Sequence, residues 1–416
     1  MIADLKPYAE YKESGLPWLG PVPTNWTTPR TKTRFRLSSE KSGKAHGKEL
    51  LSVYTHIGVR PRKDLEQRGN KATSTDGYWI VRKGDIIVNK LLAWMGAVGV
   101  SHFDGVTSPA YDVLRPRQQL ESNYYHHLFR TNLYLKLFKA QSRGIMDMRL
   151  RLYFDELGQI PLLCPPLDEQ AAIVRFLDWT NGRLERAIGA KRKVIALLNE
   201  QKHAIIHRAV TRGLNYSVSL RPSGIRWLGD IPQHWEVMRT KFLAHIKTGG
   251  RDTVDRIDGA RYPFFVRSQT VERIDSYTFD GEAVLTAGDG AGVAKVFHYI
   301  DGKFDYHQRV YKFSNFKRVS GRFFFFYLRS ALRFEALDAS AKSTVDSLRL
   351  PLLQNFPTVV PPAEEQLAIV RAIEAETGGL DSAISRILRE IELLREYRTC
   401  FVRFRQACMN CARHKC

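Results

Sequence analysis

The sequence predicts a mixed α/β (α+β) fold: two tandem globular domains separated by two long helices that form an antiparallel coiled-coil spacer. Three observations lead to this prediction. The chain repeats itself internally, two segments carry apolar residues at heptad spacing, and the globular segments mix strand-like with helix-like runs. A length of 416 residues exceeds one ordinary core and suits two domains with connecting elements.

The internal repeat consists of two matching stretches that recur in the same order. Residues 165–175 match 361–371 at an offset of 196, and residues 14–32 match 223–241 at an offset of 209. Two similar domains in one chain can be arranged about a pseudo-twofold axis, so we expect that symmetry here. The identical pairs of the earlier stretch are Ser14/Ser223, Gly15/Gly224, Trp18/Trp227, Leu19/Leu228, Gly20/Gly229, Pro23/Pro232, Trp26/Trp235, Arg30/Arg239, Thr31/Thr240 and Lys32/Lys241.

Each repeat ends in a segment that is typical of a long helix. Pro165-Pro166 and Pro361-Pro362 interrupt the preceding structure, and acidic residues follow each pair, where a helix dipole favours negative charge. Apolar residues then recur at alternating steps of three and four, which predicts a seam that a partner helix buries. The seam residues are Leu177, Leu184, Ile188, Ile195, Leu198 and Ile205 in the first helix, and Ile373, Leu380, Ile384, Ile387, Ile391 and Leu394 in the second.

An antiparallel pairing of these helices would place the domains at opposite ends of a spacer. From Glu169 to Gly213 the first helix could extend about 65 Å at roughly 1.5 Å per residue, nearly two turns of DNA at about 34 Å each. Lys191 and Lys202 interrupt the first seam. The alternative is therefore that each helix packs on the sheet of its own domain.

The repeat and the Pro-Pro pairs set the expected domain boundaries. We expect globular domains over residues 1–164 and 215–360, and helical regions over 165–214 and 361–416. Strand-like runs occupy 78–81, 85–88 and 111–114 in the first domain and 283–285, 293–299 and 310–313 in the second. A helical stretch follows in each domain, at 124–141 and 321–337.

The charge balance points to nucleic acid as the partner. The formal net charge is +21 and the pI is near 9.8. Both globular segments carry more Lys and Arg than Asp and Glu, whereas the last segment is nearly neutral. Cationic side chains on a phosphate backbone release condensed counterions, so nucleic acid is the expected partner, and two related basic domains suggest two contacts on one duplex. A basic soluble protein of another kind, such as one bound to ribosomes, is the alternative.

Candidate DNA contacts lie beside glycine-bearing loops, which let a backbone approach phosphates or base edges closely. Tight β-turns and a solvated basic surface are the alternative explanations. Paired tryptophans at 18, 26, 227 and 235 are expected to pack on the domain cores and not on bases. The candidate DNA-binding residues are Lys41, Lys44, Arg60, Arg62, Lys63, Lys90 and Arg143 in the first domain, and Arg251, Arg267, Lys295, Arg309 and Lys342 in the second.

No motif for catalysis, metal or cofactor binding stands out. Neither Pro-Pro site has the Asn/Asp-Pro-Pro-aromatic pattern of amino-methyltransferases, and no Gly-Lys pair is followed by Ser or Thr as a nucleotide-binding loop requires. The tail residues Cys408, Cys411, His414 and Cys416 are spaced too tightly for a known zinc finger. No apolar run reaches 18 residues and no secretion signal is evident, so we expect a cytoplasmic protein with reduced thiols and no membrane contact.

The repeated motifs resemble one family. Trp-Leu-Gly, Pro and Trp over 18–26 and over 227–235 resemble the opening of the target recognition domains in type I restriction-modification specificity subunits. Residues 108–111, Ser-Pro-Ala-Tyr, are similar to an interior signature of those domains. Pro165-Pro166, Glu169-Gln170 and Ile173-Val174, with their second copies, are similar to the junctions into that family's two conserved helical regions.

The resemblance implies a non-catalytic specificity subunit in DNA methylation and defence against foreign DNA. Such a subunit reads a split DNA target, one recognition domain for each half, and binds two methyltransferase subunits and two restriction subunits. The partners, and not this chain, would use S-adenosylmethionine, ATP and Mg. One region departs from the pattern, because the tail after Arg398 does not repeat the first copy.

Two other functions remain open on the residues alone. The chain could be an autonomous sequence-specific or architectural DNA-binding protein, or an RNA-binding module. Binding that does not require a methyltransferase partner would indicate the former. Binding that duplex DNA competitors do not reduce would indicate the latter.

Overall fold

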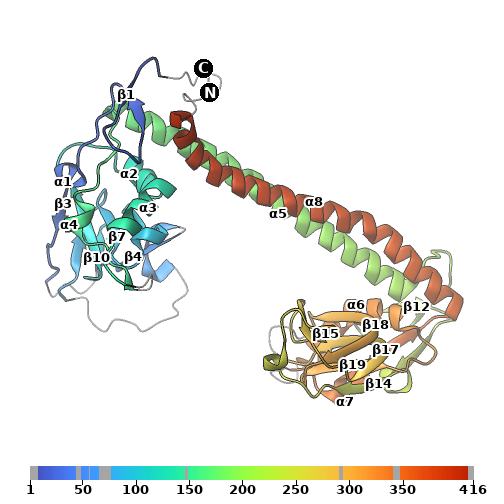
Figure 1. Ribbon diagram of the computed structural model, residues 1–416. Helices are drawn as coiled ribbons and strands as arrows, with labels where there is room; N and C mark the ends of the chain where they lie inside the picture. The colour runs from blue at the N-terminus through green and yellow to red at the C-terminus, as the bar shows by residue number, and fades with distance from the viewer. Residues whose placement is uncertain are drawn as a thin grey trace. The chain divides into compact units, whose positions relative to one another are not determined.

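The computed structural model describes residues 8–43, 48–55, 57–64, 76–145, 149–289, 294–340 and 347–410, with backbone alone over 337–340 and 399–410. The chain forms two compact units, each of which is described by itself. Unit 1 comprises residues 1–189 and 391–416, and unit 2 comprises residues 190–390 (Figure 1). The helices α5 (Leu167–Arg212) and α8 (Ala363–Asn410) each contribute residues to both units.

Unit 1 is built on a four-stranded antiparallel sheet in the order β3-β10-β7-β8. Its strands are β3 (Phe35–Ser38), β10 (Tyr111–Pro116), β7 (Ile86–Asn89) and β8 (Val98–Val100). Three strand pairs accompany the sheet: β1 (Tyr11–Glu13) with β2 (Pro21–Pro23), β4 (Leu51–Tyr54) with β5 (Gly58–Pro61), and β6 (Trp79–Val81) with β9 (Gly105–Thr107). The short helices are α1 (Thr31–Arg34), α2 (Ser122–Phe129), α3 (Asn132–Gln141) and α4 (Phe154–Leu157).

The main core of unit 1 is aromatic. Phe35 of β3, Tyr125 and Phe129 of α2, and Tyr134 and Phe138 of α3 are fully buried and meet edge-on or tilted. Large rings bury the most apolar area per side chain, and such ring pairs add attraction beyond the area itself. These contacts fix α2 and α3 on the sheet.

The helical stretch predicted over residues 124–141 is two helices, with a break at Arg130 and Thr131. The Thr131 side chain caps the second helix by accepting a hydrogen bond from the Tyr134 amide. The Arg130 guanidinium donates to the carbonyl oxygens of Gly96 at 2.8 Å, Val98 at 3.1 Å and Thr55 at 2.6 Å. A single continuous helix was therefore the wrong prediction, because these tertiary hydrogen bonds stabilise the break.

Unit 2 contains a six-stranded sheet in the order β14-β19-β17-β18-β15-β16. Gly281 and Gly302 face each other across β17 and β18, and each has a φ of 134°, a conformation that favours glycine where strands bend. The strands are β14 (His245–Thr248), β19 (Val310–Ser314), β17 (Phe279–Ala287), β18 (Phe297–Tyr306), β15 (Tyr262–Phe265) and β16 (Val271–Ile274). Two further pairs are β11 (Leu220–Pro222) with β12 (Asp230–Pro232), and β13 (Glu236–Arg239) with β20 (Pro357–Val360).

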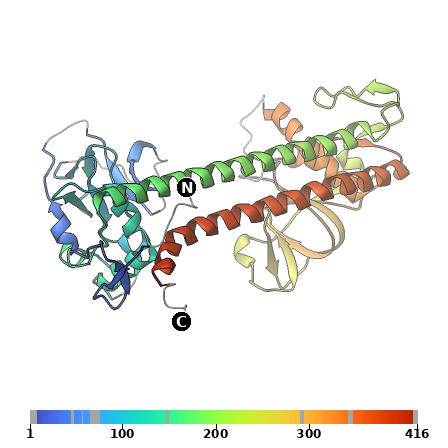
Figure 2. The same ribbon diagram turned by 90° about the horizontal axis from the view of Figure 1, so that it is seen from above.

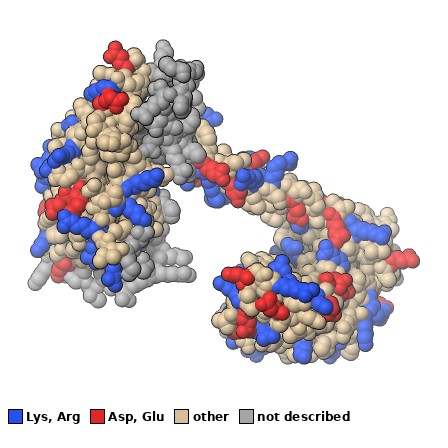
Figure 3. Space-filling model, in the orientation of Figure 1, with Lys and Arg blue, Asp and Glu red and all other residues tan. Residues whose placement is uncertain are grey.

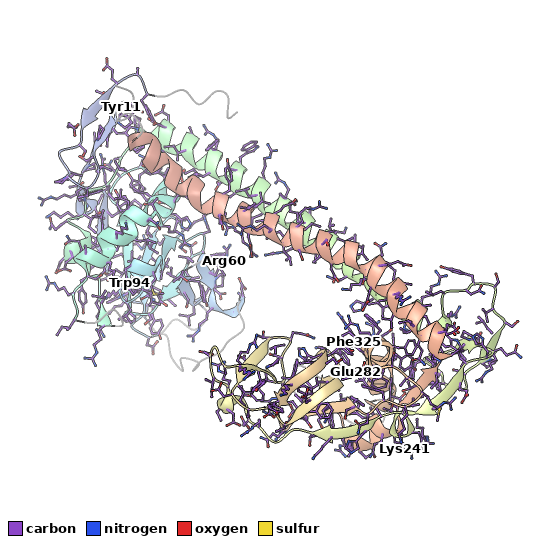
Figure 4. The ribbon with its side chains drawn as sticks, turned by 45° about the vertical axis from the view of Figure 1, so that its right-hand side comes forward. Tyr11, Arg60, Trp94, Lys241, Glu282 and Phe325 are labelled. Atoms are coloured by element: carbon purple, nitrogen blue, oxygen red, sulfur yellow. The ribbon has the colours of Figure 1, made fainter. Side chains whose placement is uncertain are left out.

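The helix α6 (Gly321–Ser340) covers β17 and β18 of this sheet. It buries Phe323, Phe324 and Tyr327 completely, and Figure 4 labels the neighbouring Phe325 with Glu282 of β17. The shorter α7 (Leu350–Asn355) leads into β20. Ile206 and Val210 of α5 and Ile369 of α8 belong to the same core, so both long helices are anchored in unit 2.

The segments of α5 and α8 in unit 2 are antiparallel. Lys191 forms an ion pair with Glu390, and Lys202 pairs with Asp381 at 2.5 Å, so the residue numbers run in opposite directions along the two helices (Figure 2). In unit 1, Arg398 of α8 pairs with Glu185 of α5. The two lysines that interrupt the seam are thus neutralised by acidic residues of the facing helix.

The twelve predicted seam residues are all buried or half-buried. Leu184, Ile188, Ile373 and Ile391 are buried, and the other eight are half-buried. Ile173 and Val174, at the start of α5, belong to the core of unit 1. Each long helix therefore packs on a globular unit near its first turns and presents an apolar stripe further along.

Candidate nucleic-acid interface

The loops predicted to contact DNA are held in the same way in both units. In unit 1 the chain leaves β7 at Lys90, whose carbonyl oxygen accepts a hydrogen bond from the Leu152 amide at 2.9 Å. In unit 2 it leaves β17 at Gly288, whose carbonyl oxygen accepts from the Leu348 amide at 2.6 Å. Leu152 and Leu348 are both buried. The segment before each long helix therefore supports the loop that follows a central strand.

In unit 1 the ammonium group of Lys90 is already engaged. It donates to the carbonyl oxygen of Pro109 at 2.9 Å and lies 3.2 Å from the Asp112 carboxylate. Burial raises the pKa of Asp112, and Lys90 opposes that shift. Lys90 thus ties the loop after β7 to the first residues of β10, so a phosphate would have to compete with a buried carboxylate for it.

The other described candidates of unit 1 lie on three separate segments. Lys41 is exposed and its backbone bridges to Trp79 of β6. Arg60, labelled in Figure 4, is the half-buried residue of β5, and Arg62 and Lys63 follow in the same segment. Lys63 pairs with Glu49, which raises the pKa of Lys63. Arg143 pairs with Glu156, and Lys44 lies outside the described residues.

In unit 2 the structure brings two of the predicted arginines to one carboxylate. Arg267 lies 3.2 Å and Arg309 lies 2.7 Å from Asp289. Burial opposes ionisation of Asp289, but the hydrogen bonds from Arg309 and Arg267 outweigh it and lower its pKa. The side chains of Arg267 and Arg309, which are 44% and 62% exposed, are thereby held at the same carboxylate. A paired guanidinium site of this kind suits phosphate or guanine.

Two further residues complete this arginine cluster, which we define as Arg251, Arg267, Asp289, His307 and Arg309. His307 is buried, its Nδ1 accepts a hydrogen bond from the Arg309 amide at 2.9 Å, and its backbone bridges to Arg251. Arg251 donates to the fully buried Asp305 at 3.3 Å.

The two remaining candidates of unit 2 are lysines outside this cluster. Lys295 is exposed, and its carbonyl oxygen accepts a hydrogen bond from the Gln269 side chain at 2.8 Å. Lys342 lies outside the described residues.

Sequence reasoning missed the residues that organise the arginine cluster. Asp289 lies within the glycine-bearing loop, between Arg267 and Arg309 in the sequence, and its acidic side chain among basic ones is the signal that could have identified it. Asp305 and His307 carry no such signal, because only the strand pairing brings them beside Arg251. On the face shown in Figure 3, Lys and Arg lie on both units with Asp and Glu among them.

The four repeated tryptophans pack on the cores, as predicted. Trp26 and Trp235 are buried, and Trp18 and Trp227 lie against the same cores half-buried. The buried pair also makes an equivalent contact in each unit. The Trp26 indole donates to Glu169 at 3.0 Å, and the Trp235 indole donates to Glu365 at 3.0 Å. The acidic first turn of each long helix therefore binds the tryptophan-bearing segment at the start of the globular part of the same unit.

The next residue of each helix repeats a second contact. The Gln170 side chain donates to the Pro165 carbonyl at 2.8 Å and accepts from the Glu121 amide at 3.2 Å. Gln366 donates to the Pro361 carbonyl at 2.9 Å and accepts from the Ser320 amide at 2.8 Å. We call these glutamate and glutamine contacts the junction frame. These contacts fix the start of each long helix relative to the other elements of the same unit.

Two expectations concern features beyond these loops. Among the described residues, no helix is both long enough and apolar enough to cross a bilayer. The tail residues Cys411, His414 and Cys416, and the side chain of Cys408, lie outside what the structure describes. The expectation that they hold no metal stays a prediction.

Comparison with known proteins gives concordant results. Residues 232–393 match the family model for the type I restriction modification DNA specificity domain. The chain is 25% identical over 176 residues to the EcoDI specificity subunit of Escherichia coli, covering 42% of this chain and 38% of that protein. It is 26% identical over 234 residues to the MjaVIII specificity subunit of Methanocaldococcus jannaschii, covering 55% of this chain and 51% of that protein. The matches thus span about half or less of these relatives' lengths.

A solved structure shares the fold. It comes from work on complex assembly and conformational transition of the type I restriction-modification system, and it superposes with a TM-score of 0.64 over 92% of this chain and 97% of that chain, at 14% identity. That likeness concerns the fold alone. The family model and the sequence relatives confirm the predicted resemblance: residues 232–393 match the DNA specificity domain of type I restriction-modification enzymes, and the chain is similar to specificity subunits of such enzymes.

Proposed function

We propose that this chain is the DNA sequence-specificity subunit of a type I restriction-modification complex and binds a bipartite DNA target. The observation that carries the proposal is the loop after the central strand, which recurs in both units with the same backbone support and with basic side chains nearby. Two equivalent sites on one basic chain suit two contacts on one duplex. Within the complex this chain supplies recognition, and methylation and cleavage belong to the partner subunits.

The domain assignment follows from the same reasoning. Residues 1–164 and 215–360 are the target recognition domains in this proposal, and residues 165–214 and 361–416 are the conserved helical regions. The helical regions act as an antiparallel coiled-coil spacer between the half-sites. The apolar stripe and the lysine–acid pairs on α5 and α8 support this role.

The proposed partners are double-stranded DNA, two methyltransferase subunits that use S-adenosylmethionine, and two ATP-driven restriction subunits that use Mg. The similarity to type I specificity subunits supports a complex of this kind. Of the twelve candidate contacts, the geometry favours those with exposed charge, above all Arg267, Arg309 and Lys295. Lys90 is the weakest, because it is bound to Asp112.

A domain exchange tests the proposal directly. Residues 33–160 are replaced by the corresponding segment of a relative, and the methylated adenines of a host that carries the partner subunits are mapped. Only one half of the methylated motif should change. A change in both halves, or specific DNA binding by this chain without any methyltransferase subunit, would contradict the proposal.

A further inference from the structure

Three large apolar side chains project from the loop between β7 and β8 of unit 1. Leu91, Leu92 and Met95 are 38%, 40% and 49% exposed, and we call them the apolar tip. Neighbouring apolar side chains that remain in water cost hydration free energy, and such groups mark surfaces that become covered by a partner. Figure 4 labels Trp94 within this loop, well apart from Tyr11 of the same unit.

The backbone of the apolar tip is ordered by its own hydrogen bonds. The buried Asn89 side chain accepts from the Leu91 amide at 2.9 Å and from the Leu92 amide at 3.2 Å. The Trp94 indole donates to the Leu91 carbonyl at 3.1 Å, and the Ala97 amide donates to the Leu92 carbonyl at 3.1 Å. Because the loop is already ordered, little conformational entropy is lost when the tip is covered.

Exposed cations lie on the two segments that adjoin the loop of the apolar tip. Lys139 of α3 lies 4.9 Å from the ring centroid of Trp94, and α3 packs against the 3-10 turn Ala93–Met95. Lys136 of the same helix is exposed. Arg149 and Arg151 are also exposed, on the segment whose Leu152 supports this loop. The two lysines favour a nucleic acid over a protein as the partner, because lysine is depleted where proteins meet proteins and cations beside an apolar contact suit phosphates beside bases.

We infer that the apolar tip lies in the major groove of the first half-site and contacts thymine methyl groups. This inference rests on the proposed function and names the base chemistry that unit 1 reads. Thymine is the one base that presents an apolar group in that groove, and apolar side chains are its usual contacts. The arginine cluster of unit 2 offers the opposite chemistry, since paired guanidinium groups suit guanine acceptors.

Uracil substitution tests the inference, because it removes the methyl group and leaves base pairing unchanged. The assembled complex with its methyltransferase subunits binds a duplex that carries the mapped target, with thymines replaced by uracil one at a time in each half-site. The domain exchange of residues 33–160 identifies the half read by unit 1. At one or two thymines of that half, affinity should fall about fourfold, as expected for one buried methyl group.

A triple variant removes the apolar tip: Leu91→Ala, Leu92→Ala and Met95→Ala. It should bind the target more weakly than the unchanged chain and should bind thymine and uracil duplexes of the first half-site equally. The matched control is Leu37→Ala, because Leu37 of β3 is 38% exposed on the same unit. The control should retain the thymine preference. Thermal unfolding of each variant shows whether unit 1 remains folded.

Three results would overturn the inference. One is a triple variant that still prefers thymine, and another is a first half-site without thymine on either strand. The third is a triple variant that no longer holds the methyltransferase subunits, which would make the apolar tip a protein interface. Failure of the proposed function looks different, since the unchanged complex would then not bind a split target at all.

Discussion

Among single residues, local ion pairs separate basic side chains that stabilise the fold from those that face solvent. Lys90 and Lys295 both stand beside a glycine-bearing loop and are equivalent by sequence pattern. In the structure Lys90 is bound to the buried Asp112, whereas Lys295 is exposed. The sequence cannot distinguish them, because Asp112 reaches Lys90 only through the pairing of β7 with β10.

Substitution of these lysines should therefore have different effects. Lys90→Ala should lower the free energy of unfolding by roughly 1–3 kcal/mol, because Asp112 loses its cation in a buried setting. Lys295→Ala should leave stability within about 0.5 kcal/mol but weaken DNA binding by the complex and reduce its salt dependence by about one unit of slope. Urea unfolding and binding at several salt concentrations measure both quantities. Equal effects of the two variants on stability would contradict this assignment.

A histidine gives unit 1 a defined pH dependence. His126 packs between Gly58 and Gly99, accepts a hydrogen bond from the Val100 amide at 3.4 Å, and faces His102, His127 and Arg130. Burial, with smaller effects of the neighbouring charges, lowers the pKa of His126 to about 3. The unfolded chain therefore binds more protons than the folded chain between about pH 3 and pH 6.5, and stability falls as the pH falls through that range.

The expected loss is at most about 1.4 kcal/mol per pH unit from this one group. His126→Asn keeps an acceptor near Nδ1 and removes the titration. Unfolding free energies at pH 7 and pH 5 should differ less in the variant than in the unchanged protein. A pH dependence that the substitution leaves intact would assign it to other groups.

At the scale of elements, the sequence predicts best those helix starts and strands that depend on residues close together in the chain. The starts of α5 and α8 follow from the Pro-Pro pairs and the acidic residues after them, and the core strands follow from short β-rich runs. The division between α2 and α3 could not be predicted, because Arg130 leaves the helix to bind carbonyls of distant segments. The arginine cluster depends in the same way on the pairing of separate strands.

The end of α5 provides a test within one helix. Gly213 follows the helix with a φ of 74°, and a Cβ there would lie 2.9 Å from Glu365 and 3.2 Å from Trp235. Gly213→Ala should therefore destabilise the protein by roughly 1 kcal/mol or more. Gly189→Ala is the matched control within α5, where a Cβ meets open space, and it should stabilise by about 0.5–1 kcal/mol. Thermal unfolding of both variants should show shifts of opposite sign.

For the whole molecule, the spacer proposal makes helix length a determinant of target geometry. One heptad is inserted into each seam, near Lys191 and near Ile387, which preserves the apolar stripe. Seven residues add about 10 Å, or about three base pairs at roughly 3.4 Å each. The longer helix also rotates one recognition domain about the DNA, so activity should fall.

The remaining methylation should occur at unchanged half-sites separated by two to four more base pairs, as mapping of methylated adenines would show. The control inserts the same heptad into α5 alone, which misaligns the seam and should abolish activity. Full activity at the original spacing would show that these helices are packing elements and not a spacer.

The junction frame has an evolutionary consequence. Its glutamate, glutamine and tryptophan contacts lie among buried side chains, whereas the apolar tip and the exposed arginines Arg267 and Arg309 lie on loops. Under the proposed function, selection for a stable fold and selection for a new DNA target therefore act on different positions. Mutations can accumulate at the loop ends with little loss of folding free energy. If each unit reads its own half-site as proposed, inheritance of an intact junction frame leaves each half of the molecule free to diverge in specificity on its own.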